Sequence, residues 1–411
     1  MRIRPSQNYL RFVNVGPVLA LAAVLIAGDA IAVEKLVDTV MFPHDPSPNG
    51  VFRWSEGSIL NLDDKNDLMM LVTASAQGGD WSPAKILEFR SADGGITWTP
   101  LAEARVFQDG QGRNVTSPSL LRLDNGHILG FFSVRTSVND EGGPWMRRST
   151  DNGQSWTEPQ QLPYSGYGIA SSDRAMQLRG GRILVPAWQS NDKLRSTYAY
   201  SFYSDDRGQT WHKTDLITTP KRTEGPPVEP PKGSIGQHID PSAEEPAVVE
   251  LKDGRLLMFI RNYSKTIFRS YSDDQGSTWS PPESTGIPSP GSQPTLTRLP
   301  NGDLLLIWNW APAEEINGPW PRKFISTAIS KDEGRTFSSL RHLDGAADFA
   351  GKITMAYAEP VGDNLVVAYS KSESMKNTYS WRLQVLPMSW LYEGDNQHVF
   401  GTPDDAPSKI K

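Results

Sequence analysis

The sequence has no cysteine and few histidines. None of its 411 residues is cysteine, which excludes both disulfide bonds and thiol chemistry. Its six histidines show no pair at the spacing typical of metal ligands, so we expect no metal centre, and we likewise expect no cofactor. Stability must therefore come from a packed core, which a chain of this length is able to form.

The sequence also has fewer positively charged than negatively charged residues. The chain has 41 Lys and Arg residues against 47 Asp and Glu residues, a net charge of −6. This acidic balance argues against nucleic acid and against anionic lipid as partners.

Apolar runs long enough to span a membrane are missing. The run at residues 18–27 is only about half of a membrane-spanning helix, so we expect no membrane anchor. Three arginines precede it and an Ala-x-Ala sequence follows it at residues 30–32, a pattern typical of a secretory signal peptide. We predict a signal peptide at residues 1–32, and secretion or a periplasmic location. The mature chain then has a net charge of about −8.

The chain does contain one short loop repeated five times. Each copy reads S-x-D-x-G-x-T/S-W/F, and the copies are residues 91–98, 149–156, 204–211, 272–279 and 330–337. Their aspartates lie 58, 55, 68 and 58 residues apart, about the length of a four-stranded sheet. Asp and Ser side chains accept backbone N–H groups in tight turns, and Gly supplies a positive φ. The repeat predicts a β-propeller.

A second repeat predicts the number of blades. Six segments consist of an apolar strand, a turn with Gly or Asn and a second apolar strand, and they are residues 57–72, 119–132, 175–186, 247–260, 295–308 and 355–369. We predict an all-β, six-bladed propeller in a single domain at residues 33–411. Residues 35–42 are expected to pair with the last blade and close the ring. The alternative is an open β array or two sandwiches. The proline-rich segment 220–231 is expected to be a surface loop.

The repeated loop resembles the Asp box of the sialidase superfamily, and the resemblance covers essentially the whole chain after residue 32. It implies a sialidase-like propeller in which the box is a structural turn between the third and fourth strands of a blade. It therefore predicts fold better than function. The Gly turns and the boxes then lie at one face of the ring. We expect a ligand site at the opposite face, around the channel.

Glu245 and Arg261 are the strongest candidates at that face. Glu245 starts the first strand of its hairpin and Arg261, sixteen residues later, ends the second. The resemblance implies that this Glu activates the nucleophile and that this Arg binds the substrate carboxylate through two hydrogen bonds. It implies the same carboxylate-binding role for Arg322, eight residues before Ser330. A surface ion pair is the alternative for Glu245 and Arg261.

Three further candidates lie in loops or at strand starts. Asp80 follows two glycines that allow a close approach to a ligand, and the resemblance implies that it is the acid/base residue. Asp173 and Arg174 precede the third hairpin, where the resemblance makes them candidates for substrate contacts or for assisting catalysis. An ordinary Asp in a polar loop is the alternative for Asp80, and a structural strand cap is the alternative for Asp173.

Two departures from the family pattern bear on the substrate and on the nucleophile. Where sialidases have a first-blade Arg that completes a triad on the substrate carboxylate, one register puts Glu56 and a register shifted by three residues puts Arg53. Where they have a nucleophilic Tyr, strict alignment puts Met355, with Tyr357 two residues later on the same strand face. A core aromatic is the alternative for Tyr357.

Together these residues predict a secreted exo-glycosidase of sialidase type that acts on terminal sialic acid or a related anionic sugar of a glycan. Asp80 would be the acid/base residue and Glu245 would activate Tyr357. One alternative is a hydrolase or lyase acting on another glycan, such as an arabinose- or uronate-containing polysaccharide. The other is a propeller that binds glycans without catalysis.

Overall fold

The computed structural model describes residues 33–401 except 46, 48–49, 63–65, 81, 102–112, 136–142, 165–167, 171–172, 192–195, 222–240, 317–321 and 377. In this part of the chain the strands form five sheets, and the helices are two short 3-10 segments, η1 (Ala313–Glu315) and η2 (Met388–Tyr392). None of its helices is long and apolar enough to cross a membrane. The predicted signal peptide and most of the proline-rich segment 220–231 lie outside the described residues.

The described strands belong to one eight-stranded sheet and four smaller sheets. The eight-stranded sheet contains β2 (Arg53–Asn61), β3 (Leu68–Ser75), β4 (Ala84–Ser91), β5 (Thr99–Pro100), β6 (Asn114–Arg122), β7 (Ile128–Arg135), β8 (Gly143–Ser149) and β9 (Gln160–Gln161). The next sheet along the chain contains β10 (Gly168–Ala170), β11 (Met176–Gln177), β12 (Ile183–Asn191), β13 (Ser196–Ser204) and β14 (His212–Lys213). The third contains β15 (Glu244–Glu250), β16 (Leu256–Arg261), β17 (Thr266–Ser272) and β18 (Glu283–Pro288). The fourth contains β19 (Thr295–Arg298), β20 (Leu304–Trp308), β21 (Phe324–Ser330), β22 (Thr336–Gly345) and β26 (Phe400–Gly401), and the last contains β1 (Val37–Phe42), β23 (Lys352–Val361), β24 (Asn364–Ser372) and β25 (Ser380–Pro387).

The prediction of six separate sheets is wrong for this hydrogen-bonding pattern. Four sheets have the four or five strands of a propeller blade, but the described residues form five sheets in total. The difference arises where β4 meets β6, because Ala84 pairs with Asn114 in parallel and so joins two antiparallel groups of strands into one sheet. The predicted all-β propeller architecture is otherwise present.

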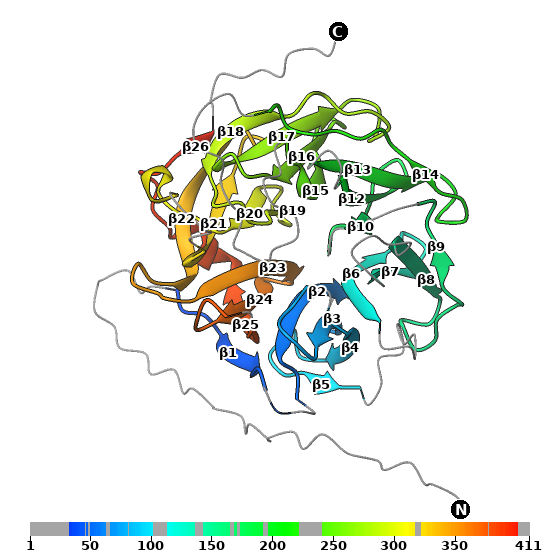
Figure 1. Cartoon of the computed structure of the whole chain (residues 1–411), viewed down its shortest axis with the longest axis horizontal. Coiled ribbons are helices and arrows are strands. Elements are labelled where there is room, and N and C mark those ends of the chain that lie inside the picture. The colour runs from blue at the N-terminus through cyan, green and yellow to red at the C-terminus, as the bar shows by residue number, and fades with distance from the viewer. Residues whose placement is uncertain are drawn as a thin grey trace, which may run out of the picture. The chain divides into compact units, whose positions relative to one another are not determined.

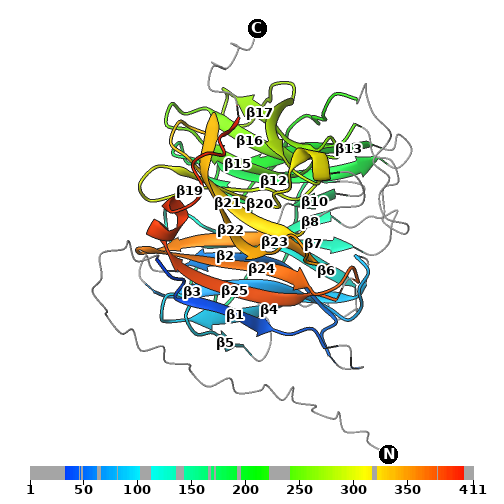
Figure 2. The same cartoon turned by 90° about the vertical axis from the view of Figure 1, so that its left-hand side faces the viewer.

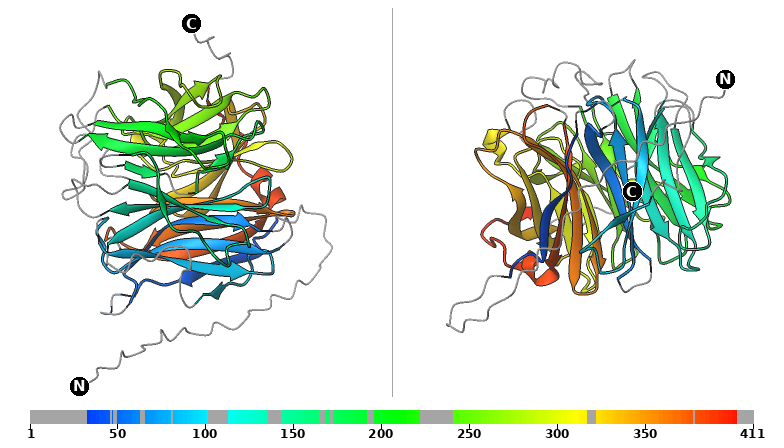
Figure 3. Two further views of the ribbon diagram at one scale, coloured as in Figure 1. Left: turned by 90° about the vertical axis from the view of Figure 1, so that its right-hand side faces the viewer. Right: turned by 90° about the horizontal axis from the view of Figure 1, so that it is seen from below.

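The sheets surround a common centre, with β2, β6, β10, β15, β19 and β23 innermost (Figure 1). Around the ring β2 contacts β6, β6 contacts β10, β15 contacts β19 and β19 contacts β23. The second sheet reaches β15 through β12, and β23 contacts β2, which completes the ring. The predicted closure is confirmed, because β1 pairs antiparallel with β25 from the other end of the chain. These two strands lie side by side in Figure 2, and blue and orange-red strands are again adjacent in both views of Figure 3.

Apolar packing between neighbouring groups of strands forms the core. The described residues contain six clusters of buried apolar side chains, and each cluster draws on two groups that are adjacent around the ring. One of the six lies between the two halves of the eight-stranded sheet, where Met69 and Leu71 of β3 are buried with Ile128 of β7. The core is thus distributed over the interfaces, so each group of strands depends on both of its neighbours for burial.

The five repeated loops share one hydrogen-bond geometry. In each, the Ser hydroxyl donates to the Asp Oδ1 atom at 2.8 Å and accepts the N–H group of the Gly at the fifth position of the loop at 2.7–2.9 Å. The Asp Oδ2 atom accepts the Thr or Ser hydroxyl at 2.5–2.6 Å. These bonds lower the pKa of all five aspartates. The residues of the pattern S-x-D-x-G-x-T/S therefore stabilise the turn through hydrogen bonds within the loop itself.

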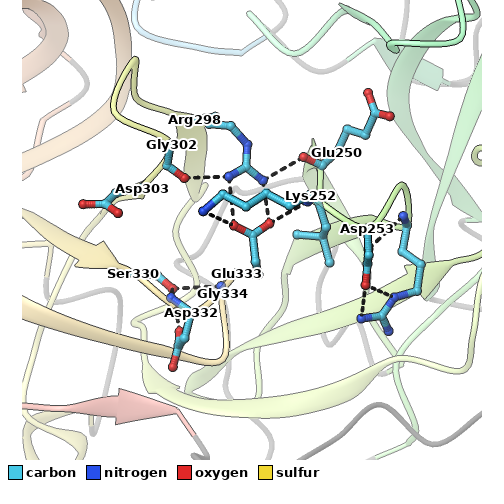
Figure 4. Close-up of polar contacts among 12 residues, drawn as sticks. Glu250, Lys252, Asp253, Arg298, Gly302, Asp303, Ser330, Asp332, Glu333 and Gly334 are labelled. Atoms are coloured by element: carbon cyan, nitrogen blue, oxygen red, sulfur yellow. Dashed lines mark hydrogen bonds and ion pairs between the residues drawn. The ribbon is translucent and has the colours of Figure 1, made fainter.

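Glu333, in the last of these loops, links two sheets (Figure 4). Its carboxylate accepts both terminal nitrogens of Arg298 at 2.8 and 3.0 Å, and it also accepts the backbone N–H group of Lys252 at 2.8 Å. Arg298 ends β19 of the same sheet, whereas Lys252 lies in the turn between β15 and β16 of the adjacent sheet. Burial tends to raise the pKa of Glu333, but the hydrogen bonds from Arg298 and Lys252 outweigh it and lower the pKa to about 2.

We expect Glu333→Gln to lower the free energy of unfolding at pH 7 by about 2 kcal/mol, because charge-assisted hydrogen bonds of this kind are lost. The pKa of Glu333 is lower in the folded state than in the unfolded state. Its contribution is therefore present above about pH 4.5 and is lost as the pH falls toward about 2. Denaturant unfolding at pH 7 and pH 3 measures this, with Glu373→Gln as the control, since the side chain of Glu373 is 76% exposed. A difference from wild type that is equal at both pH values would contradict the assignment.

Candidate active site

Five residues with left-handed backbone conformation mark the same position at the start of a hairpin. They are Glu56, Ser117, Asp173, Glu245 and Met355, with φ between 43° and 56°. Four of them lie in a β-bulge between the first and second strands of the hairpin, and Asp173 lies three residues before the start of β11. Such conformations are costly for non-glycine residues and gather at functional sites. In this alignment Glu56 and Met355 share the position of Glu245.

Glu245 and Arg261 form a partly buried ion pair. Glu245 Oε2 accepts Arg261 Nη1 at 2.7 Å, and each side chain is 14% exposed. The preceding residue, Glu244, is 3% exposed, and its Oε2 atom lies 3.6 Å from Arg261 Nε. Burial opposes charge on Arg261, but the charges of Glu245 and Glu244 outweigh it and raise the pKa of Arg261 above its usual value.

Arg53 and Asp80 form a second ion pair. Arg53 Nη1 donates to Asp80 Oδ1 and also to the Gly78 carbonyl oxygen at 3.4 Å. Arg53 is buried, whereas the Asp80 side chain is 58% exposed. The Arg53 charge lowers the pKa of Asp80 to about 2, against the effect of burial, so Asp80 is ionised in the free protein at neutral pH.

Arg135, which the sequence analysis missed, joins Asp80 to Glu56. It is the last residue of β7, as Arg261 is the last residue of β16. Its Nη1 atom donates to the Asp80 carbonyl oxygen at 3.0 Å, and its Nη2 atom lies 3.9 Å from Glu56 Oε1. Glu56 Oε2 accepts the Ser117 N–H group at 2.8 Å. The sequence signal that could have identified Arg135 is its place at the end of the second strand of a hairpin, the place that Arg261 also has.

Arg322 lies close enough to Arg261 for their charges to interact. It donates to Thr354 Oγ1 at 3.0 Å and to the Gly291 carbonyl oxygen at 2.6 Å. Burial and then the positive charge of Arg261 lower the pKa of Arg322. Arg261 also acts on Asp80, and Glu245 acts on Arg322. The structure thus brings Asp80, Glu245, Arg261 and Arg322 into one electrostatic neighbourhood.

Arg174 spans the centre of the ring. Its Nη2 atom donates to the Pro294 carbonyl oxygen at 3.0 Å and to Thr295 Oγ1 at 2.9 Å, and its guanidinium lies over the ring of Tyr357. Tyr357 has no exposed surface and also stacks on Trp381. The hydrogen bonds of Arg174 therefore join distant strands of the ring, and Tyr357 lies within the core.

Asp173 is held between neighbouring strands. Its N–H group donates to the Pro118 carbonyl oxygen at 3.0 Å, and its Oδ1 atom accepts the hydroxyl of the wholly buried Ser58. Burial raises the pKa of Asp173 to about 6, although the hydrogen bond from Ser58 and the charge of Arg174 oppose this. These contacts agree with the strand-cap alternative, while the role of Asp173 in substrate binding stays a prediction.

A cavity of about 900 Å³ opens at the other end of the channel. Its lining includes the ends of β2 and β23 and the turn residues Asp124, Gly126 and Gly181. It also includes Asp173 and Arg174, but neither Asp80 nor Glu245. Among the described residues, no group of three or more His, Cys, Asp or Glu residues is arranged to hold a metal ion.

The match to a known family covers residues 100–384, more than half of the chain, and the family is described as the BNR repeat-like domain. The chain belongs to this family. A curated sialidase of Paraclostridium sordellii is 27% identical to this chain over an alignment of 219 residues, and the match covers 46% of this chain and 48% of that relative. The aligned part thus spans about half of the relative's length. The chain is therefore a sialidase-like member of the BNR-repeat superfamily.

Solved structures show the same fold. A Dyadobacter fermentans protein of unknown function matches with a TM-score of 0.65 and 18% identity, over 87% of this chain and 100% of the other. Trypanosoma rangeli sialidase in complex with sialic acid matches with a TM-score of 0.63 and 15% identity, over 86% of this chain and 59% of the other. At these identities the likeness concerns the fold of the BNR-repeat chain alone.

We expect the stability of the wild-type protein to fall relative to Asp173→Asn as the pH rises from about 4 to above about 6. The pKa of Asp173 is higher in the folded state than in the unfolded state, so the folded state binds the additional proton in this window. The difference should be on the order of 1–3 kcal/mol, and Asn keeps an oxygen that accepts the Ser58 hydroxyl. Thermal unfolding of both proteins at pH 5 and pH 8 measures it. Parallel pH profiles would contradict the prediction.

Proposed function

We propose that this protein is a glycoside hydrolase of sialidase type that releases terminal sialic acid or a related anionic sugar from glycans. The observation that carries the proposal is a group of one buried and two partly buried arginines around two carboxylates. Arg53, Arg261 and Arg322 lie in the same electrostatic neighbourhood as Asp80 and Glu245. Guanidinium groups bind carboxylates through paired hydrogen bonds, so this group suits a sugar acid.

The proposal includes a six-bladed ring. The eight-stranded sheet consists of two antiparallel groups joined at Ala84 and Asn114, and the described core has six interfaces. We count each antiparallel group as one blade, with the inner ends of all six around one channel. The leader at residues 1–32 supports a secreted or periplasmic location, where glycans are accessible.

Asp80 must gain a proton to act as the acid. In the free protein Arg53 keeps the pKa of Asp80 at about 2. A substrate carboxylate that binds Arg53 competes with Asp80 for that cation and also brings a like charge close to Asp80. Both effects raise the pKa of Asp80. Substrate binding thereby prepares Asp80 to protonate the leaving oxygen and then to activate water.

The position of Glu56 favours a second candidate function, in which the substrate is a glycan other than a sialoside. Its carboxylate shares the backbone position of Glu245 and is held by the N–H group and the hydroxyl of Ser117 at 2.8 and 3.0 Å. The first-blade register thus puts a carboxylate where sialidases have an arginine, and a carboxylate there disfavours an acid group nearby. An arabinose residue has no acid group, and a uronate can direct its acid group at Arg261 and Arg322, so a polymer that contains either sugar avoids this repulsion.

Release of 4-methylumbelliferone from its sialoside and from a panel of other glycosides tests the proposal. We expect Asp80→Asn to lower kcat on the accepted glycoside by about 10²–10⁴-fold, because proton transfer is lost. Glu245→Gln should lower kcat as well, because the anion that holds Arg261 is lost. Asn and Gln keep an oxygen for Arg53 and Arg261 but remove the anion, so each variant is expected to lose some stability, and unfolding midpoints check that it is folded at the assay temperature. Asp253→Asn is the control, since Asp253 pairs with Arg255 in an exposed turn.

A folded protein that hydrolyses uronate or arabinose glycosides but no sialoside would replace the first candidate by the second. A folded protein that binds glycans yet hydrolyses none of the panel would overturn the enzymatic proposal and leave the non-catalytic propeller.

A further inference from the structure

A tyrosine and a buried carboxylate lie next to Arg261. Tyr263 Oη is 2.9 Å from Glu244 Oε2 and 3.1 Å from Glu244 Oε1, and it donates its proton to this carboxylate. Arg261 Nη2 donates to the same phenol oxygen at 3.3 Å. Burial and the charge of Glu244 raise the pKa of Tyr263, with Arg261 opposing, so the phenol keeps its proton in the free protein. The phenol oxygen has a proton acceptor on one side and a cation on the other, so its proton can pass to Glu244 as the phenol oxygen forms a bond.

Glu244 is fixed in this arrangement. It is 3% exposed, and the side chain of the wholly buried Thr197 also forms a hydrogen bond with it. Burial raises the pKa of Glu244, with Arg261 opposing, so its carboxylate holds a proton more readily than an exposed one. A nucleophile, a base within hydrogen-bond reach and a third group that orients the base are the usual elements of covalent catalysis.

Tyr263 lies at the same face as Asp80. It is two residues beyond the end of β16, in the loop that leads to β17, and Asp80 lies in the corresponding loop between β3 and β4. Tyr263 is partly exposed, whereas Tyr357 has no exposed surface. Met355, which shares the position of Glu245, has no nucleophilic atom of the required kind.

We propose that Tyr263 is the nucleophile of this site and that Glu244, rather than Glu245, is its base. This inference rests on the proposed function. Glu245 then keeps Arg261 in position through the ion pair at 2.7 Å, and Arg261 contacts both the substrate and the phenol oxygen. The assignment differs from the sequence prediction, in which Glu245 activates Tyr357.

The reaction balances in two steps. Tyr263 Oη bonds to the anomeric carbon while its proton passes to Glu244, and the bond to the leaving oxygen breaks with its electron pair as Asp80 protonates that oxygen. Water then attacks the anomeric carbon and gives one proton to Asp80, while the bond to Tyr263 Oη breaks and Glu244 returns the proton to the phenol. The net change is hydrolysis with the enzyme regenerated.

Three variants test the assignment on whichever anionic glycoside the wild-type protein hydrolyses. We expect Tyr263→Phe and Glu244→Gln each to lower kcat by about 10²-fold or more, with a smaller change in KM, because a proton transfer or bond-forming group is lost. Tyr271→Phe is the matched control: Tyr271 lies on β17 beside Arg255 and Arg269, and we expect it to keep wild-type kcat. Unfolding midpoints check that each variant is folded.

Covalent labelling provides a readout that a structural role would not change. The reagent is a sialic acid with fluorine at C3 and fluoride at the anomeric carbon. Fluoride leaves readily, so the tyrosyl adduct forms rapidly, and the fluorine at C3 makes hydrolysis of that adduct slow. After tryptic digestion, Tyr263 lies in the peptide 262–265 and Tyr357 in the peptide 353–371. We expect the added mass on 262–265 in wild type and in Tyr271→Phe, and no label in Tyr263→Phe.

The outcomes separate this inference from the function on which it rests. Turnover with the label on 353–371, or Tyr263→Phe with at least a third of wild-type kcat, overturns the inference and leaves the glycosidase proposal intact. Absence of turnover on every anionic glycoside and absence of label overturn both.

Discussion

The left-handed residue at the start of five of the six hairpins is the constraint on which the site depends. A non-glycine residue in this conformation costs on the order of 1 kcal/mol, so the surrounding contacts must maintain it. Glu56 is held by hydrogen bonds from Ser117, Glu245 by Arg261, and Asp173 by its bond to the Pro118 carbonyl oxygen. The same backbone feature thus orients acidic side chains from several sheets and ties each to a partner.

Charge compensation follows from this arrangement. Arg53 and Arg135 are less than 9% exposed, and a buried guanidinium without an anion would be strongly destabilising. Asp80 neutralises Arg53 and two glutamates neutralise Arg261 in the free protein. A substrate carboxylate would exchange with these internal anions. The binding affinity for an acidic sugar therefore depends on a difference between two similar ion pairs, which favours selectivity over tightness.

The sequence was sufficient for the architecture because the repeated elements are local. The S-x-D-x-G-x-T/S loop is closed by its own side chains, and hairpins form between adjacent strands, so both leave a pattern in the chain. The pairing of Ala84 with Asn114 joins two groups of strands into one sheet. This pairing is not visible as a sequence pattern, because it depends on a single backbone pair between β4 and β6. The count of separate sheets was wrong for that reason.

The candidate site was predictable only in part. The sixteen-residue spacing of Glu245 and Arg261 was informative, because it reflects a hairpin of fixed length whose ends meet at one rim. The roles of Tyr263 and Arg135 were not visible, since their partners come from a strand start or from a different strand group. The register of Glu56 and Met355 also required the bulges, because one extra residue in a strand changes which side chain faces the channel.

The pairing of β1 with β25 has a consequence for biosynthesis. Val37 and Val385 are neighbours in the sheet although almost the whole polypeptide lies between them. The first strand emerges from the ribosome long before its partner exists, so the ring stays open throughout translation and seals only when the last strands arrive. A circular permutant with new termini at an outer loop and a short turn joining β1 to β25 would convert this slowest, most distant contact into a local one.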